Sequence, residues 1–197
     1  MSGKVACEAC GAMILPSTAK ANDGVCMPCK RGDRGHIETA KIRYAERKKA
    51  QATPEPATLH WRWLVQQVHQ SPHGFAGLSA ENQNYFAACL LEGEVYNGGF
   101  DQYFHNSSAD HYADAIRGLQ EIGAAECTRL AVAAKEVLFG ADDVPGTQDS
   151  RWSRIGEMAP AREDKLEELD RQFGKESARL RDLAGQYARR HGLLEGF

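Results

Sequence analysis

Two close pairs of cysteines constrain the N-terminal segment more tightly than any other feature of the sequence. They follow the spacing C-x2-C-x15-C-x2-C and comprise Cys7, Cys10, Cys26 and Cys29. Four thiolates at this spacing suit tetrahedral zinc, because each pair can wrap the ion in a tight turn. A segment this short buries too little apolar surface to fold without a cross-link such as a bound metal ion. The spacing therefore predicts a four-cysteine zinc-ribbon module over residues 1–31, with iron as the alternative metal.

Local sequence within this module suggests how the cysteines are presented. Gly11 directly follows the second cysteine and is expected to adopt the positive φ of a metal-knuckle turn. Short strands are expected at residues 13–15 and 24–25. A redox role for the cysteine pairs is not favoured, because redox C-x-x-C pairs lie at the head of a helix in a βαβ setting, which this segment lacks.

The next segment, residues 32–57, is interpreted as a basic linker that is partly helical. Residues 30–49 carry eight Lys and Arg side chains against three acids, and a helix is expected over residues 37–50. Two interpretations remain open. The stretch is either a solvated linker or a weak contact for nucleic-acid phosphates. Pro54 and Pro56 mark its end.

From Thr58 onward the apolar residues recur at helical spacing, and no alternating run is long enough for a strand. The sequence therefore predicts an all-α bundle of about six helices over residues 58–192. Thr58 and Ser79 are expected to cap two of these helices, and Ser107 with Asp110 resembles a capping box. Apolar spacing predicts a long helix at the C-terminal end, ended by Gly192.

The stretch EVYNGGFDQYFHNSSAD, residues 94–110, contains a dense run of aromatic and amide side chains. Its glycines are expected to end one helix, and Phe100, Tyr103 and Phe104 share one face of a short second helix. We interpret it chiefly as a structural bend. The alternative is a binding surface centred on Gln102, Tyr103 and His105. The motif residues are Asn97, Gly98, Gly99, Phe100, Gln102, Tyr103, Phe104, Asn106 and Ser107.

Catalysis is the least favoured class of function. Asp101 and His105 lie four residues apart and share a helix face, which would suit a hydrolase or a second metal site, but ordinary surface polar residues are the preferred interpretation. No phosphate loop, nucleophile elbow or Rossmann fingerprint occurs in the sequence. Cys89 and Cys127 lie on apolar helical stretches and are expected to be buried thiols. We therefore predict a protein without enzymatic activity.

The hydropathy and charge patterns limit the cellular locations and the binding partners that the sequence allows. No apolar run approaches the roughly 18 residues that span a membrane, and the N-terminus lacks a signal-peptide core, so a cytoplasmic protein is expected. Residues 1–53 carry ten Lys or Arg and five Asp or Glu, a net charge of +5. Residues 54–197 carry fourteen and twenty-two, a net charge of −8.

The motif NGGF-x-QYF-x-NSS, a helix ending in LQEIGA and a later LEELDRQF resemble a helical domain family typified by a bacterial DNA-mimic protein. The resemblance covers about residues 60–190. It implies an all-α domain, often dimeric, that binds another protein. In the typifying member, acidic side chains imitate DNA phosphates and occupy the DNA-binding face of a transcription factor. The N-terminal CEACGAMILPSTAKANDGVCMPCKRG is similar to a small zinc-ribbon cap found ahead of various bacterial domains.

Together these features predict a bacterial protein-binding module, regulatory or immunity-like, with structural zinc. A transcription regulator is one candidate partner, and a homodimer is one candidate assembly. DNA mimicry itself stays open, because the acids of the last helix are mixed with arginines and a phosphate mimic needs a dense carboxylate array. The rival hypothesis, from a different class, is a nucleic-acid-binding protein that uses the zinc ribbon and the basic linker.

Overall fold

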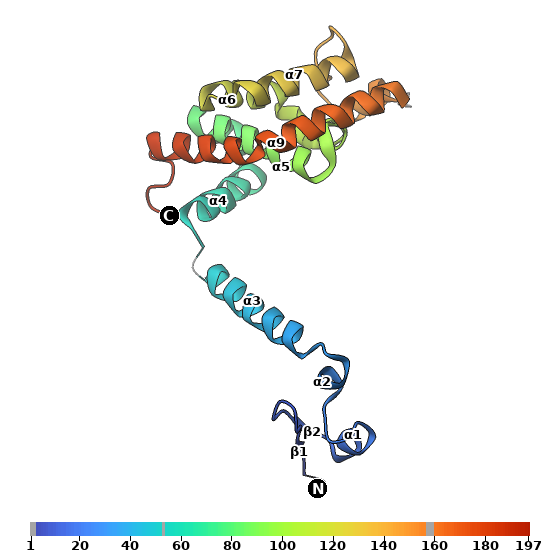
Figure 1. Ribbon diagram of the computed structural model, residues 1–197. Coiled ribbons are helices and arrows are strands. Elements are labelled where there is room, and N and C mark those ends of the chain that lie inside the picture. The colour runs from blue at the N-terminus through green and yellow to red at the C-terminus, as the bar shows by residue number, and fades with distance from the viewer. Residues whose placement is uncertain (1–2, 53, 157–159) are drawn as a thin grey trace. The chain divides into compact units, whose positions relative to one another are not determined.

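The computed structural model describes residues 3–52, 54–156 and 160–197. It divides into two compact units, Met1–Pro54 and Glu55–Phe197, each with its own internal contacts (Figure 1). The predicted fold class is confirmed: the chain is helical, with a small N-terminal module that contains one two-stranded sheet.

The N-terminal unit begins with a hairpin. Strand β1 (Val5–Ala6) pairs antiparallel with β2 (Met13–Ile14). The prediction of a second strand at residues 24–25 was wrong, because Gly24 has a φ of 80° and lies in a turn in which its N–H donates to the Ala19 carbonyl. Helices α1 (Pro16–Ala21) and α2 (Met27–Arg31) follow, each with proline in its first turn. Proline suits that position because the N–H it lacks would have no helical partner.

Helix α3 (Arg34–Ala52) occupies most of the segment that was expected to be a partly helical linker, and it is longer than the helix predicted over residues 37–50. Every side chain from Glu38 to Lys49 is exposed, so this stretch of α3 buries no apolar face. Ion pairs between Glu38 and its helical neighbours Arg34 and Lys41 span 3.5 Å and 3.2 Å. Pairs at this spacing stabilise an exposed helix modestly.

The second unit contains six α-helices among its described residues, as the apolar periodicity predicts. They are α4 (Pro56–Gln70), α5 (Ala80–His105), α6 (Tyr112–Ile122), α7 (Ala125–Phe139), α8 (Gln148–Ile155) and α9 (Pro160–Arg190). Two short 3-10 helices, η1 (Gly74–Gly77) and η2 (Ser107–His111), flank α5. Helix α5 packs against α6 and α9, and α7 packs against α9 (Figure 1).

The predicted helix cap at Ser79 is confirmed, and those at Thr58 and Ser107 are wrong. The Ser79 hydroxyl caps α5 by accepting from the Asn82 N–H at 3.3 Å, and Gly123 ends α6 in the left-handed conformation. Thr58 does not cap α4, which begins two residues earlier at Pro56. The expected capping box fails as well. Ser107 opens η2 without a side-chain cap, and Asp110 pairs instead with Arg151, at 2.7 Å.

One continuous apolar core stabilises the second unit. Its fully buried members include Leu64 of α4, Leu91 of α5, Leu119 of α6, Leu130 of α7 and Phe173 of α9. Burial of these stripes is the main favourable term in folding, at about 1.5–3 kcal/mol for each large side chain. No helix in the described ranges is long and apolar enough to cross a membrane.

Candidate functional site

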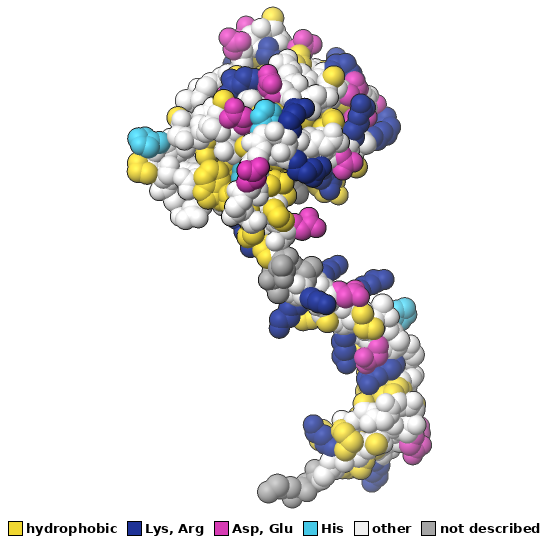
Figure 2. Space-filling view, turned by 90° about the vertical axis from the view of Figure 1, so that its left-hand side faces the viewer, with side chains coloured by type: hydrophobic (Ala, Val, Ile, Leu, Met, Phe, Trp, Pro, Cys, Tyr) yellow, Lys and Arg dark blue, Asp and Glu magenta, His cyan; other side chains and the backbone are white. Residues whose placement is uncertain are grey.

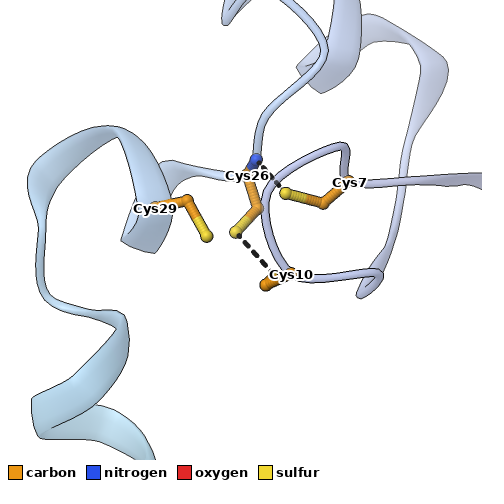
Figure 3. Close-up of side chains that lie close together, drawn as sticks. All are labelled: Cys7, Cys10, Cys26 and Cys29. Carbon is orange, nitrogen blue, oxygen red and sulfur yellow. Dashed lines mark hydrogen bonds between the residues drawn. The ribbon is translucent and has the colours of Figure 1, made fainter.

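The four predicted cysteines converge at one point of the N-terminal unit. Cys7 and Cys10 lie in the turn between β1 and β2, Cys26 precedes α2, and Cys29 lies within α2 (Figure 3). Their Sγ atoms all lie within 4.8 Å of one another. The Sγ atoms of Cys10 and Cys26 are 3.7 Å apart. A tetrahedron with metal–sulfur bonds of about 2.3 Å has sulfur–sulfur edges of about 3.8 Å, so this arrangement can bind a metal ion.

Backbone geometry around the cluster orients the thiols. Gly11 has a φ of 71°, as predicted for the knuckle turn, and its N–H donates to the Cys7 carbonyl at 2.7 Å. The Cys26 N–H donates to the Cys7 Sγ at 3.1 Å, and this bond is the largest of several that lower the pKa of the Cys7 thiol to about 6, whereas hydrogen bonding with Cys26 and Cys10 raises the pKa of the Cys29 thiol to about 12. A lowered pKa favours the thiolate, which is the form that binds a metal. No other group of three or more ligand side chains converges in the described part of the chain.

The second candidate region is the predicted bend, which is a kink inside one helix rather than a helix end. Gly98 and Gly99 interrupt α5 with non-helical backbone angles, and the helix resumes at Phe100. The interruption divides α5 into a first limb, residues 80–97, and a second limb, residues 100–105. Gly99 has the positive φ, 78°, whereas Gly98 has a φ of −158°. The sequence leaves open which glycine of the pair adopts the left-handed conformation, and in the structure it is Gly99.

Asp170 of α9 explains why position 99 is glycine. The Phe100 N–H, the first free donor after the kink, donates to the Asp170 Oδ1 at 2.8 Å. A Cβ atom on Gly99 would overlap the same carboxylate. Burial raises the pKa of Asp170, while its bond from Phe100 opposes that rise. The carboxylate therefore acts as a cap, supplied from 70 residues away, for the second limb of α5.

The polar side chains of the motif converge on Glu94, in the first limb of α5. Gln102 Nε2 and Asn106 Nδ2 donate to Glu94 Oε2 at 2.8 Å and 2.9 Å, and Ser108 Oγ donates to Oε1 at 2.8 Å. Neutral donors thus tie the limbs of the kinked helix to each other and to η2. Sequence reasoning missed Glu94, whose role depends on partners that the kink brings together.

The C-terminal end of α5 is satisfied by side chains of α8. Arg151 is fully buried and donates to the carbonyls of Phe104, Asn106 and Pro145 at 2.9 Å, 2.8 Å and 3.0 Å. Trp152 Nε1 and Gln148 Nε2 both donate to the His105 carbonyl at 2.7 Å. The last carbonyls of a helix have no partner within it, and α8 supplies these partners.

The remaining motif residues divide between core and surface. Phe100, Tyr103 and Phe104 are fully buried, as their shared helix face predicts, whereas Asn97, Gly98 and Ser107 are exposed. The burial of Tyr103 removes it from any binding surface around Gln102 and His105. His105 Nδ1 lies 3.1 Å from Asp101 Oδ1.

Cys127 is buried and Cys89 is largely enclosed, and burial raises the pKa of both thiols to about 12.

Comparison with known proteins identifies the second unit. The model of one protein family, described as DMP19-like protein, matches residues 76–191. No curated protein and no solved structure matches the chain. The matched range contains the kink, Glu94, Arg151 and Asp170, and it spans more than half of the sequence. The chain therefore belongs to the DMP19-like protein family.

Proposed function

We propose that the helical unit captures a DNA-binding protein and has no catalytic activity of its own. The observation that carries this proposal is the family match over residues 76–191, since the family resembles a bacterial DNA mimic. The geometry is compatible with such a role. The polar residues of the kink bond to one another and to backbone, which is the arrangement of a rigid scaffold.

The charges of α9 suggest which part of the surface meets a basic partner. Residues 160–170 carry five acids and two bases, a net charge of −3, whereas residues 171–190 carry two acids and six bases, a net charge of +4. Glu163, Asp164 and Glu167 are exposed. On the face of the helical unit that Figure 2 draws, blue and magenta side chains are interspersed. We place the partner on the acidic half of α9, where attraction to a basic surface is least opposed.

A competition experiment tests the capture of a DNA-binding protein. The tagged full chain is used to capture partners from nuclease-treated lysate, and duplex DNA is then added to the bound fraction. A partner that occupies the chain through its DNA-binding face is released by the duplex. A captured protein that duplex DNA does not displace would contradict this choice of partner while leaving protein binding intact.

Matched charge variants locate the surface. The double variant Glu163→Lys/Glu167→Lys is expected to weaken capture more than tenfold, because it converts two attractions into two repulsions. The control, Glu121→Lys/Glu195→Lys, makes the same change in net charge at exposed positions outside α9 and is expected to retain capture. Equal losses in both variants would mean that net charge alone, and not the acidic half of α9, drives binding.

A second candidate function, nucleic-acid binding by the N-terminal unit, is favoured by the surface of α3. Dark blue side chains recur along this helix with few magenta ones among them (Figure 2). Tyr44 is 70% exposed, and with Arg43, Arg47 and His36 it lines a hollow on one face of α3. An exposed aromatic ring between arginines can stack on an unpaired base while the arginines contact phosphates.

Salt dependence separates the two candidates. Binding of a labelled single-stranded oligonucleotide by α3 should weaken steeply between low and moderate salt, and Arg43→Ala/Arg47→Ala should reduce the slope. Arg62→Ala/Arg117→Ala, in the helical unit, is the matched control. Oligonucleotide binding with no salt dependence would argue against phosphate contacts by α3.

We also propose that the four-cysteine cluster holds zinc in a structural role. Support comes from the all-thiol donor set and the closed grouping of the four sulfurs, which leaves no ligand position for a substrate. Iron suits the same donors, so the metal content of the purified protein decides between them. One equivalent of zinc per chain is expected, and iron with its visible absorption would overturn the assignment.

A further inference from the structure

A cavity of about 270 Å³ lies between α4, the first limb of α5 and η2. It is smaller than the roughly 300–1,000 Å³ of pockets that enclose a drug-sized ligand, and so it suits a single side chain. Its apolar wall is formed by Trp61, Val65, Val68, Phe86 and Leu90. Its polar lining comprises His69, Glu94, Ser107, Ser108 and His111.

Glu94 is the one Asp, Glu, Lys or Arg side chain among the residues that line this cavity. Its three partners, Gln102, Asn106 and Ser108, are all neutral. Within the described ranges, no Lys, Arg or His lies within ion-pair distance of it. Glu92, two residues earlier, differs in pairing with Arg181 at 3.3 Å. Glu94 therefore offers a carboxyl group without a cationic partner, with which a cationic side chain from outside could pair.

The hydrogen bonds to Glu94 leave room for one further donor. A carboxylate has about four acceptor positions, of which two on Oε2 and one on Oε1 are used. The three donors also hold the carboxylate in one orientation. Burial lowers the pKa of His111, against the opposing effect of Asp114 and Asp110, and so favours the neutral form of its imidazole.

The apolar walls of the cavity suit the methylene stem of a long basic side chain. The rings of Trp61 and Phe86 are stacked, with centroids 5.2 Å apart and an interplanar angle of 18°. Aromatic faces attract cations, most strongly the indole ring of tryptophan. The aliphatic side chains of Val65, Val68 and Leu90 match the methylene stem of a long basic side chain, which packs on apolar surface while its head meets a charge.

We propose that this cavity receives a single lysine or arginine side chain from a protein partner, with the Glu94 carboxylate as its counter-ion. The proposal rests on the proposed function, in that a captured protein supplies the cation. A phosphate group is the wrong occupant, because it would meet the Glu94 carboxylate. The motif then has a role beyond the kink: Gln102 and Asn106 orient Glu94, and Ser107 lies at the rim of the cavity.

The test uses small probes and needs no knowledge of the partner. N-acetyl-arginine methylamide and its neutral isostere N-acetyl-citrulline methylamide are titrated separately into the full chain, and the Trp61 indole N–H resonance is followed by NMR. That resonance is identified with Trp61→Phe. The arginine probe is expected to shift it saturably, and the citrulline probe is expected to bind about tenfold more weakly, because a charge-assisted hydrogen bond is replaced by a neutral one.

Two variants and a control make the outcome specific. Glu94→Gln should abolish the preference for the arginine probe, whereas Glu136→Gln, which removes an exposed carboxyl outside the cavity, should keep it. Val65→Phe fills the cavity without removing the charge and should block both probes. Equal affinity for the two probes, or a preference that survives Glu94→Gln, overturns the proposal.

The probe experiment and the capture experiment fail independently. Probe binding without any captured protein would uphold the cation site and refute the proposed function. Capture that persists in Val65→Phe, together with no probe binding in the parent chain, would refute the cation site and leave the proposed function standing.

Discussion

Arg151 is the residue whose removal should damage the helical unit most. Its side chain is fully buried, it satisfies three backbone carbonyls, and it pairs with Asp110 at 2.7 Å. Arg151→Ala removes all four interactions. Breaking a buried ion pair from one side costs about 3–5 kcal/mol, and each buried carbonyl left without a donor costs about 1–3 kcal/mol.

These costs overlap, since solvent can reach part of what the arginine leaves behind. The Asp110 side chain is 45% exposed, so water can stabilise the carboxylate that remains. We therefore expect a loss of about 3–5 kcal/mol in the free energy of unfolding, a large part of the 5–15 kcal/mol that typically stabilises a domain. Arg151→Lys should recover part of this loss, because an ammonium group keeps the charge but cannot reproduce the spread of the guanidinium donors.

Arg154 offers a matched control on the same helix. It pairs with Asp142 at 2.5 Å, but the two side chains are 53% and 66% exposed. An exposed pair of this kind contributes about 0–1 kcal/mol, so Arg154→Ala should barely change stability.

Denaturant unfolding followed by tryptophan fluorescence measures both variants. All three tryptophans, Trp61, Trp63 and Trp152, lie in the second unit, so the signal reports that unit alone. Because Trp152 bonds close to Arg151, circular dichroism should confirm the midpoints. A loss below about 1 kcal/mol for Arg151→Ala, or an equal loss for Arg154→Ala, would refute the argument that burial makes the difference.

Three further outcomes follow from the geometry. Gly99→Ala should lower the free energy of unfolding by about 2 kcal/mol or more, because the added Cβ strains a positive φ and meets Asp170. Gly93→Ala should raise the free energy of unfolding by about 0.5–1 kcal/mol, because Gly93 is a helical position with open space around it. Denaturant unfolding midpoints measure both changes. Burial lowers the pKa of His60 below 6.5 in the folded state, so the stability that neutral His60 contributes is complete above pH 6.5 and is lost as the pH falls toward the folded-state pKa. His60→Phe should therefore lessen the acid sensitivity of unfolding. An unchanged dependence of the unfolding free energy on pH would contradict this. Chelation of the metal should unfold the residues around the cysteine cluster and leave tryptophan fluorescence unchanged, since the two units have separate cores; a coincident loss of the fluorescence signal would show that the units depend on each other.

Much of the architecture follows from patterns that are local in the sequence. The cysteine spacing and Gly11 predict the four-cysteine cluster because a knuckle turn involves only a few consecutive residues. Apolar periodicity predicts the helices of the second unit, and Gly123 and Gly140 mark two of their ends. The helix boundaries at Pro56 and Ser107 were less predictable, because several nearby residues could have served as caps.

The kink shows where such reasoning stops. The pair Gly98-Gly99 indicates a break in a helix, but not which glycine has the positive φ, nor that the helix continues beyond it. That choice depends on Asp170, 70 residues along the chain, whose carboxylate fills the space that a side chain at position 99 would need.

By itself, the sequence determined the fold class, the clustering of the four cysteines and the inward face of the motif, because each depends on spacing along one segment. Only the tertiary structure decided the roles of Glu94, Arg151 and Asp170. Charged residues on helices usually face water, and nothing local distinguishes these three from their neighbours. Their roles arise because packing removes them wholly or partly from solvent and supplies partners up to 70 residues distant, and an enclosed charge or helix end must find such partners.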